Sequence, residues 1–270
     1  MRGMAGLENI PQELAAETPQ DNGDQTIAAS GVEVSIVVKR EWKKDKNEAG
    51  QLEICEAIRL VAGKCPRIRS SCYWAGTSSI ATEVLGHRRS MDLDFHTLQA
   101  LRDVRPILAE IQHVFGPRFR LVESPDAFGS GFRGILKLPA GGSIGLEVLS
   151  NYEDTRKSDL EPSISAPGLR RVSLERYLAD KVQCLVERVE ARDLVDVLAV
   201  IRHSPALRAR LQRLVMAQDA VLFAERLLGW TATSIRKDLA AYRDVDPADA
   251  MAARDLILGF IGKQKRNKGG

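Results

Sequence analysis

The 270-residue sequence has few of the features that mark secreted, disulfide-bonded or membrane-spanning proteins. Its four cysteines are scattered, with no Cys-x-x-Cys pair and no histidine at ligand spacing, which excludes a disulfide framework and a zinc site. No run of about 18 or more apolar residues is present, so no membrane-spanning helix is expected. The first residues lack the basic-then-apolar pattern of a secretory signal. These absences predict a cytoplasmic protein with reduced thiols and no membrane partner.

The net charge is also small, at +3, but this total conceals two oppositely charged ends. Residues 1–28 carry one basic and five acidic side chains, whereas residues 251–270 carry five basic and one acidic. Residues 1–28 show no sustained periodicity, and we expect a mobile acidic tail there and a basic tail over 263–270. Four net basic charges are a weak indication of a nucleic-acid partner, because such tails usually only increase solubility.

Near its middle, the remaining sequence changes from a mixture of strand and helix patterns to helix patterns alone. Between residues 29 and 166 short strand patterns mix with helical ones, and the periodicity predicts an α+β domain. Strands are expected at 32–38, 71–74, 91–95, 119–122, 132–138 and 143–149, and helices at 48–61, 78–85 and 98–115. Residues 151–168 are polar and proline-containing, which predicts a loop. A helical domain is expected over 167–262, with helices at 173–189, 192–203, 206–216, 218–228, 231–243 and 247–262.

The most specific chemistry lies in two neighbouring segments, 74–79 (WAGTSS) and 88–95 (RRSMDLDF). On a strand, Asp92 and Asp94 share one face while Leu93 and Phe95 point to the other. Two adjacent carboxylates repel each other unless a cation lies between them, and hard oxygen ligands suit Mg²⁺ or Mn²⁺. Gly76, Thr77 and Ser78 at a strand-to-helix turn offer backbone amides to a phosphate.

Each segment also has a simpler interpretation. Asp-x-Asp alone is more often a solvated strand face, and Gly-Thr-Ser-Ser alone is more often a helix cap. The order strand, turn, helix, strand within a short stretch favours a nucleotide site. A third carboxylate could come from Glu147, which alternation places on one strand face with Gly145 and Leu149. Glu147 would bind metal or accept a proton from an attacking hydroxyl, and an exposed strand glutamate is an equal alternative.

In the helical region, Lys181 and Arg188 are two helical turns apart and project from the same helix face. Asp193 and Asp196 stand near the start of the next helix, where their spacing alone indicates helix capping. Two further motifs are rejected. Residues 129–134 spell Gly-x-Gly-x-x-Gly but precede a strand pattern, and residues 62–65 lack the upstream glycine of a P-loop.

Taken together, the segments 74–79 and 88–95 resemble the AbiEii/AbiGii-type toxins, a nucleotidyltransferase family of the polymerase-β-like superfamily. Residues 172–181 (VSLERYLADK), Arg188 and residues 192–196 (RDLVD) are similar to the helical signature of that family. The resemblance covers roughly residues 70–205. Where the family has two glycines this chain has Ala75-Gly76, which predicts a looser backbone approach to phosphate.

The resemblance implies a polymerase-β-like nucleotidyltransferase domain with a mixed sheet, followed by a C-terminal helical domain. It implies that Asp92 and Asp94 bind Mg²⁺ or Mn²⁺, that Lys181 reaches the triphosphate of an NTP, and that Asp193 orients Lys181 or the nucleotide. It also implies a bacterial toxin with a cognate antitoxin protein, and RNA, tRNA in particular, as one acceptor. Two alternatives stay open: a nucleotidyltransferase acting on an antibiotic or metabolite, and a non-catalytic nucleotide-binding partner of the same fold.

Overall fold

The computed structural model describes residues 50–90, 92–188, 190–242 and 244–268. The acidic tail expected at 1–28 and the strand expected at 32–38 lie outside the described residues. Within these residues, seven strands form one mixed sheet in the order β3-β4-β5-β2-β1-β7-β6. The strands are β1 (Cys72–Ala75), β2 (Asp92–Ala100), β3 (Phe119–Glu123), β4 (Gly131–Lys137), β5 (Ser143–Asn151), β6 (Leu160–Pro162) and β7 (Arg170–Val172).

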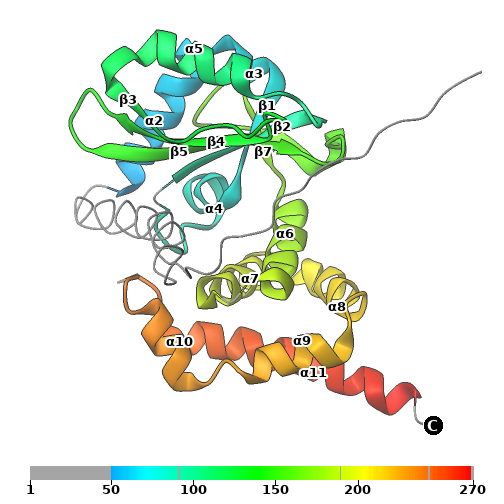
Figure 1. Cartoon of the computed structure of the whole chain (residues 1–270). Coiled ribbons are helices and arrows are strands. Elements are labelled where there is room, and N and C mark those ends of the chain that lie inside the picture. Colours follow the sequence, from blue (N-terminus) through cyan, green and yellow to red (C-terminus); the bar gives the residue numbers. More distant parts are fainter. Residues whose placement is uncertain (1–49, 91, 189, 243, 269–270) are drawn as a thin grey trace, which may run out of the picture. The chain divides into compact units, whose positions relative to one another are not determined.

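One face of the sheet is covered by three helices (Figure 1). They are α2 (Gly50–Lys64), α3 (Pro66–Ser71) and α5 (Arg105–Phe115). Strand β2 shows why this face is apolar: Leu93 and Phe95 are fully buried in the core beneath these helices, while Asp92 and Asp94, which alternate with them, are half-buried. The predicted alternation along this strand is therefore confirmed, and it directs both aspartates to the opposite face.

A short helix, α4 (Gly76–Ile80), follows β1 directly and continues as one π-helical turn over Ala81–Leu85. The expected helix at 78–85 is thus confirmed, with a start two residues earlier. It ends at Gly86, whose φ of 59° is the left-handed conformation that glycine adopts without strain. Helix α4 contacts β2 and carries the chain from β1 to the aspartate strand.

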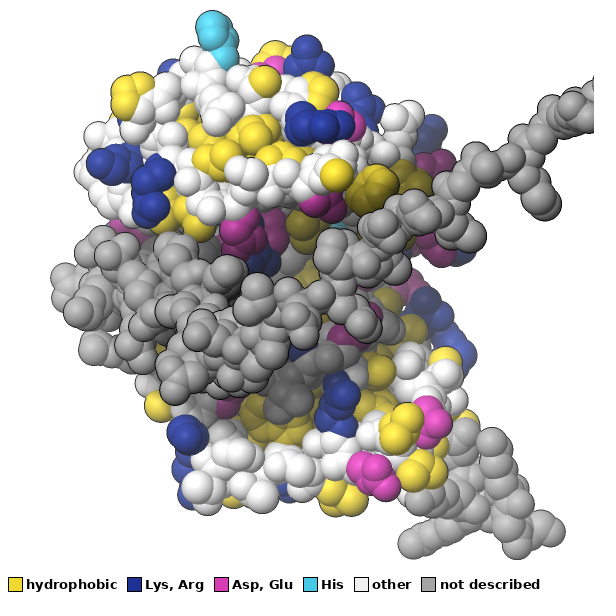
Figure 2. All heavy atoms as spheres, viewed as in Figure 1, with side chains coloured by type: hydrophobic (Ala, Val, Ile, Leu, Met, Phe, Trp, Pro, Cys, Tyr) yellow, Lys and Arg dark blue, Asp and Glu magenta, His cyan; other side chains and the backbone are white. Residues whose placement is uncertain are grey.

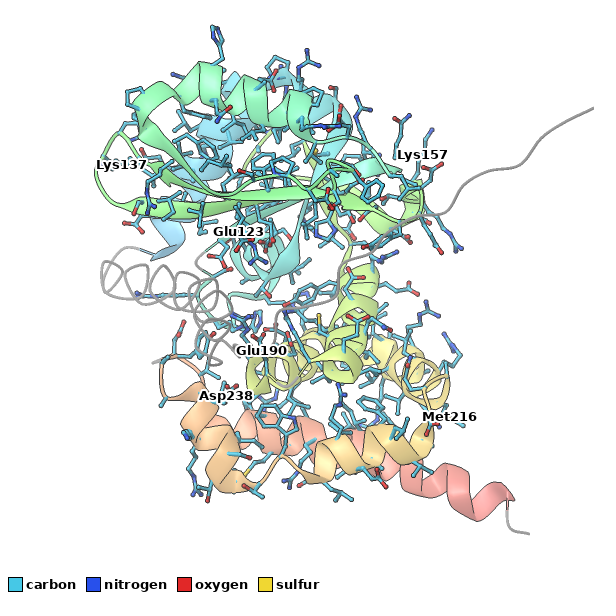
Figure 3. All side chains as sticks on the ribbon, viewed as in Figure 1. Glu123, Lys137, Lys157, Glu190, Met216 and Asp238 are labelled. Carbon is cyan, nitrogen blue, oxygen red and sulfur yellow. The ribbon has the colours of Figure 1, made fainter. Side chains whose placement is uncertain are left out.

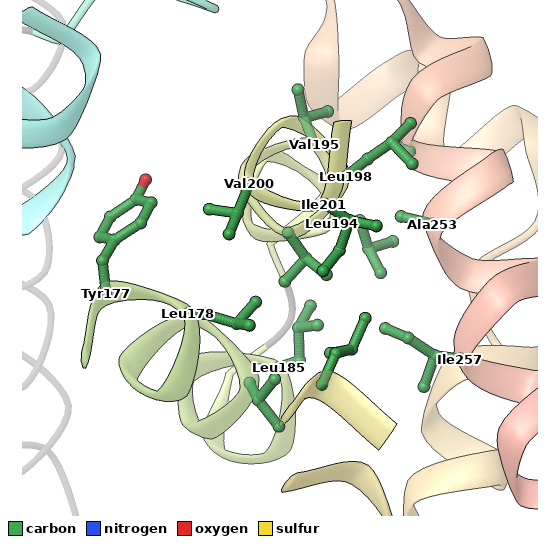
Figure 4. Close-up of a cluster of buried hydrophobic side chains, with 14 of the residues drawn as sticks. Tyr177, Leu178, Leu185, Leu194, Val195, Leu198, Val200, Ile201, Ala253 and Ile257 are labelled. Carbon is green, nitrogen blue, oxygen red and sulfur yellow. The ribbon is translucent and has the colours of Figure 1, made fainter. Parts of the chain in front are cut away.

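The chain after residue 173 is helical, as expected. Its helices are α6 (Leu174–Glu187), α7 (Ala191–His203), α8 (Arg208–Met216), α9 (Ala220–Leu228), α10 (Ala232–Leu239) and α11 (Pro247–Lys268). Figure 4 shows Leu178 and Leu185 of α6 packed with Leu194 of α7 and Ile257 of α11. Helix α11 extends into the segment expected to be a basic tail. The α+β class with C-terminal helices is confirmed.

The helix expected at 98–115 is wrong in its first part. Residues 98–100 belong to β2, and α5 begins only at Arg105. Local periodicity suggested a helix there, but Ala100 pairs with Asn151 of β5, which extends the strand. Leu101 then has a φ of 49°, which breaks the strand before α5 begins at Arg105 with Pro106 in its first turn.

The loop expected at 151–168 is also corrected, because it contains β6, which pairs with β7 at the sheet edge. The buried carboxylate of Glu83 anchors this segment. It accepts hydrogen bonds from the Ser163 hydroxyl and from the backbone amides of Ile164 and Ser165. Helix α3 was not expected either, because six residues are too short to show periodicity. No helix among the described residues is long and apolar enough to cross a membrane.

Candidate functional site

Asp94 stands at the centre of the candidate site because two neighbouring strands bring other site residues beside it. On one side β1 runs antiparallel to β2 and pairs Ala75 with Asp94. On the other side β5 runs parallel to β2 and pairs Glu147 with Asp94. The glycine turn that follows β1, the Asp-x-Asp strand and the third carboxylate therefore meet on one face of the sheet, although 71 positions separate Gly76 from Glu147.

The contact between Gly76 and Asp94 is the tightest in this group. A Cβ atom built on Gly76 would lie 2.0 Å from Oδ2 of Asp94, and the residue has a φ of 67°. Both observations require glycine, since a side chain would collide with the carboxylate and strain the backbone. The second position of the family's glycine pair is thus essential to this geometry, whereas Ala75 fits in an extended conformation at the end of β1.

The carboxylates of the site repel one another. Burial raises the pKa of Asp94 to about 8, and the negative charges of Asp92 and Glu147 act in the same direction. The positive charges of Lys181 and Arg133 oppose this shift without cancelling it. A half-buried carboxylate with such a pKa binds protons readily, and a divalent cation would relieve the same repulsion.

Glu147 belongs to a row of charges that continues across the sheet. The guanidinium of Arg133 on β4 donates to Glu147 at 2.5 Å and lies 3.5 Å from Glu123 on β3. Figure 3 shows Glu123 on the side of the sheet opposite α5, the side on which this row lies. The register places Glu147 beside the aspartates, as predicted, but its carboxylate is oriented by Arg133 as well.

Lys181 lies on α6 and is almost fully buried between two carboxylates. Its ammonium is 2.7 Å from Asp193 and 2.9 Å from Asp196, both on α7. Burial opposes the charged form, but these two carboxylates raise the pKa of Lys181 above its ordinary value, so it remains protonated. Arg188 also donates to Asp193, at 3.0 Å. The sequence predicted that Lys181 and Arg188 project from one helix face, but α6 ends at Glu187 and Arg188 follows it in extended backbone; the two cations share Asp193 instead.

Asp196 has more partners than its sequence position suggested. Arg88 forms a bidentate pair with it at 2.6 and 2.9 Å, and His87 and Thr77 also bond to it. Burial alone would raise the pKa of Asp196, yet the charges of Arg88 and Lys181 hold it well below the ordinary value. This buried aspartate therefore joins the segment before β2 to the helices after residue 173.

The side chains of the glycine turn are engaged within the protein. The hydroxyl of Ser78 is buried and accepts a 2.8 Å hydrogen bond from the Trp74 indole. The hydroxyl of Thr77 donates to Asp196 and accepts from Arg88 and from Tyr177 on α6. The groups of Thr77 and Ser78 that could meet a phosphate are therefore backbone amides rather than hydroxyls.

Arg88, Tyr177 and His87 were not among the expected site residues. Arg88 lies in the segment 88–95 and Tyr177 in the segment 172–181, but no spacing rule connects residues about a hundred positions apart. The available signal was burial: an arginine that is 5% exposed and a tyrosine that is 1% exposed need polar partners. That signal exists only in the folded structure.

The donors fit a hard divalent cation bound with its substrate rather than in a complete protein cage. Among the described residues, no group of three histidine, cysteine or acidic side chains converges at metal-binding distance. Mg²⁺ is commonly held by one or two carboxylates plus substrate phosphates and water. Asp92 and Asp94 satisfy this pattern, and such an ion would offset both the burial and the neighbouring negative charges that raise the pKa of Asp94.

Comparison with known proteins gave a family match and several structural relatives. The family model described as "Nucleotidyl transferase AbiEii toxin, Type IV TA system" matches residues 76–263. No curated protein sequence matched the chain. A candidate nucleotidyltransferase from H. pylori superposes with a TM-score of 0.50 at 16% identity, covering 82% of this chain and 98% of that one.

Two other solved structures have lower scores. JHP933 from Helicobacter pylori has a TM-score of 0.47 at 16% identity and covers 81% of this chain and 94% of its own. MenT4, a nucleotidyltransferase toxin from Mycobacterium tuberculosis H37Rv, has a TM-score of 0.46 at 15% identity, with 85% and 89% covered. At such identities structural likeness shows the fold alone, and the two scores below 0.50 carry no argument. The range of the family match contains Gly76, both aspartates, Lys181 and Asp193.

Proposed function

Because this chain belongs to the AbiEii family of nucleotidyl transferase toxins, we propose that it transfers a nucleoside monophosphate from an NTP to an acceptor hydroxyl, with release of pyrophosphate. The observation that carries the proposal is the arrangement around Asp94. Gly76 leaves just enough room for its carboxylate, and Glu147 is its register partner. Three sequence segments thereby build one acidic face beside the glycine turn.

Asp92 and Asp94 would hold Mg²⁺, or Mn²⁺ in its place. Such an ion supplies positive charge that binds the triphosphate and stabilises the negative charge developing on it. In the protein, the backbone amides of residues 76–78 would hold phosphate oxygens at the start of α4. The acceptor oxygen forms a bond to the α-phosphorus, and the bond from that phosphorus to the β-phosphate oxygen breaks.

Glu147 is the residue proposed to accept the proton of the attacking hydroxyl, with Arg133 orienting its carboxylate. Lys181 would contribute positive charge toward the leaving pyrophosphate, consistent with its effect on the pKa of Asp94. Asp193 would orient Lys181 through their 2.7 Å ion pair. Asp193 is therefore assigned a positioning role.

For the acceptor we propose RNA, with tRNA as the first case to test, and for the biological role the toxin of a pair with a cognate antitoxin. One observation favours the alternative of a small-molecule acceptor. On the face shown in Figure 2, the visible Lys and Arg side chains are scattered rather than gathered into one stripe. An extended basic stripe is the usual electrostatic feature of an RNA-binding surface.

The test is a transfer assay with Mg²⁺, each α-labelled NTP in turn, and total RNA. Wild-type protein should label RNA, and Asp94→Asn should reduce labelling by at least about a hundredfold, since it removes a charge placed for the reaction. Asp255→Asn is the matched control, because Asp255 is 63% exposed on α11 and removal of its charge should leave the rate unchanged.

The outcomes separate the proposals. Labelling of RNA that both aspartate variants retain equally would contradict the assigned site. Absence of labelled RNA with every NTP would exclude the RNA acceptor, and labelling of small hydroxyl compounds under the same conditions would then favour the alternative. Normal growth on induced expression would contradict the toxin role. Removal of residues 263–270 tests the C-terminal basic residues, since unchanged RNA binding would show that they are not part of the RNA site.

A further inference from the structure

His96 continues the polar face of β2 beyond the two aspartates, and the proposed reaction gives it no role. Side chains two positions apart on a strand point to the same face, so Asp92, Asp94 and His96 form one row with steps of about 7 Å. All three are half-buried, whereas the residues between them are fully buried on the other face. His96 therefore borders the same side of the sheet as the carboxylates.

The strand pairings place His96 on the far side of Asp94 from the glycine turn. Ala75, the last residue before that turn, pairs with Asp94, and Tyr73 pairs with His96. The rings of Tyr73 and His96 lie side by side, with centroids 5.8 Å apart. The turn, Asp94 and His96 thus follow one another in this order along the sheet.

Two carboxylates lie near the imidazole of His96 without bonding to it. Burial lowers the pKa of His96, and the negative charges of Asp180 on α6 and Glu147 on β5 oppose this shift. Asp180 is already paired with Arg176 at 2.7 Å, and Glu147 is paired with Arg133. The imidazole is therefore close to the proposed proton acceptor, and both neighbouring carboxylates have other partners.

Asn151 at the end of β5 fixes which nitrogen of His96 carries a proton. Its amide group lies 2.7 Å from the carbonyl oxygen of Thr97 and 2.8 Å from the hydroxyl of Thr155. Because a carbonyl oxygen only accepts hydrogen bonds, the NH₂ of Asn151 faces Thr97, and its amide oxygen faces Nδ1 of His96 at 3.1 Å. Nδ1 is therefore the donor, and Nε2 bears the lone pair of the neutral ring.

Nε2 of His96 is the nitrogen that remains available to a ligand. Among the described residues no hydrogen bond reaches it, and it is not one of the enclosed side-chain atoms that lack a partner. It lies at the outer end of the ring, farther from the backbone than Nδ1, on the face that holds the carboxylates. A fixed ring with one accessible nitrogen is suited to recognising a single polar group.

We propose that Nε2 of His96 forms a hydrogen bond with a ribose hydroxyl of the bound NTP, so that the site favours ribonucleotides over nucleotides that lack this hydroxyl. The inference rests on the proposed function, in which the phosphates lie at the glycine turn and at Asp92 and Asp94. The ribose is the group attached to the α-phosphate, so it is the part of the NTP that comes next in the direction of His96. A hydroxyl both donates and accepts, so this bond does not depend on the charge of the ring, whereas the amino group of a base only donates. Asn151 is a positioning residue in this arrangement.

The test compares sugar analogues on the same protein. Equilibrium binding of ATP, CTP, GTP and UTP is measured with Mg²⁺ and without acceptor RNA, and each is compared with its 2′-deoxy and 3′-deoxy forms. His96→Asn removes Nε2 while its amide can still donate to Asn151, and His96→Gln places an amide near the position of Nε2. His113→Asn is the matched control, because His113 is exposed on α5, which covers the opposite face of the sheet (Figure 1).

Wild type and His113→Asn should bind the preferred ribonucleotide about tenfold more tightly than either its 2′-deoxy or its 3′-deoxy form, the effect of one hydrogen bond. His96→Asn should lose this preference by weakening the ribonucleotide alone, and His96→Gln should restore part of it. Because all sugars are measured on each variant, a general loss of stability does not imitate this result.

Equal binding of the three sugars by wild type, or a preference that His96→Asn retains, would overturn the proposal. If wild type then still labels RNA in the transfer assay, the proposed function stands without it. Sugar-selective binding that depends on His96, with no transfer to any acceptor, would contradict the proposed reaction and keep the ribose contact. Absence of NTP binding would contradict both.

Discussion

Gly76 is the residue on which the position of Asp94 depends most directly. Its hydrogen occupies the place where any other residue would put a Cβ atom 2.0 Å from Oδ2 of Asp94. Because Asp94 is also fixed by the β1 and β5 pairings, it cannot move away without disturbing both strands. Gly86 offers a natural comparison, since its φ is also positive but a Cβ atom built on it would meet no other atom within 4 Å.

Gly76→Ala should therefore lower transfer activity by about a hundredfold or more, since a displacement of about 1 Å in a reacting group has effects of that size. Gly86→Ala should cost about 1–2 kcal/mol of unfolding free energy from left-handed backbone strain while activity is kept. Transfer assays and denaturant unfolding of both variants provide the measurements. Equal activity in the two variants would contradict the steric argument.

The raised pKa of Asp94 predicts how pH affects stability in the absence of metal. In the unfolded chain Asp94 ionises near its ordinary value of 3.8, whereas in the folded protein it retains its proton up to about 8. Its contribution is thus fully present below 3.8 and is lost as the pH rises toward 8. Unfolding free energies in EDTA should decline over this range more steeply for wild type than for Asp94→Asn.

Added Mg²⁺ should reverse that decline. We expect it to stabilise wild type more at about pH 8 than at about pH 5, because ionised Asp94 and Asp92 bind the ion while protonated Asp94 does not. Asp94→Asn should show little of this difference. A stabilisation by Mg²⁺ that is the same in both proteins at the higher pH would mean that the ion binds elsewhere.

At the scale of single elements, the turn between β1 and α4 is held by its own side chains. The Trp74 indole on β1 donates to Ser78 on α4 in the buried interior, so the hydroxyl fixes the helix against the strand. The sequence suggested Ser78 as a phosphate ligand, and its hydroxyl is engaged differently. The two roles predict different consequences for the same substitution.

Ser78→Ala should destabilise the protein by about 1–3 kcal/mol, because the Trp74 N–H is left without an acceptor. The KM for the NTP should not change. Ser70→Ala, at an exposed position on α3, should have a negligible effect on stability. Denaturant unfolding and steady-state kinetics give both quantities. A raised KM with unchanged stability would instead indicate a hydroxyl that contacts phosphate.

The elements also show where sequence periodicity is informative. Helices α6 to α11 and strand β2 were predicted because long helical periods and strict alternation reflect one buried face. The start of α5 was wrong because the β2–β5 pairing extends a strand that local pattern cannot see. Strand β6 and helix α3 have only three and six residues, too few for a period to be read.

At the scale of the whole molecule, Asp196 connects the sheet-containing half to the helical half. It accepts from Arg88 and Thr77 before β2 and from Lys181 on α6, all of them buried. Loss of one partner from such buried ion pairs leaves an uncompensated buried charge. The two halves should therefore unfold together.

Arg88→Met should lower the unfolding free energy by about 3–5 kcal/mol, because Asp196 then lacks its bidentate partner. The neighbouring Arg89 has an exposed side chain, and Arg89→Met should change stability by less than about 0.5 kcal/mol. Near-UV and far-UV circular dichroism measured during denaturation test both points. Separate transitions in wild type would contradict the view that Asp196 couples the halves.

The sequence by itself determined the α+β class, the sides of β2 on which Asp92 and Asp94 lie, and the family, because these follow from local alternation and from motifs within short segments. Only the tertiary structure decided what Glu147, Thr77, Lys181 and Asp196 contact. Those contacts join residues far apart in the chain, and they depend on strand order and on burial, which removes water as the alternative partner for each charge. The net charge of +3 shows none of these pairings, because it adds up the charged groups without showing which of them become neighbours in the fold.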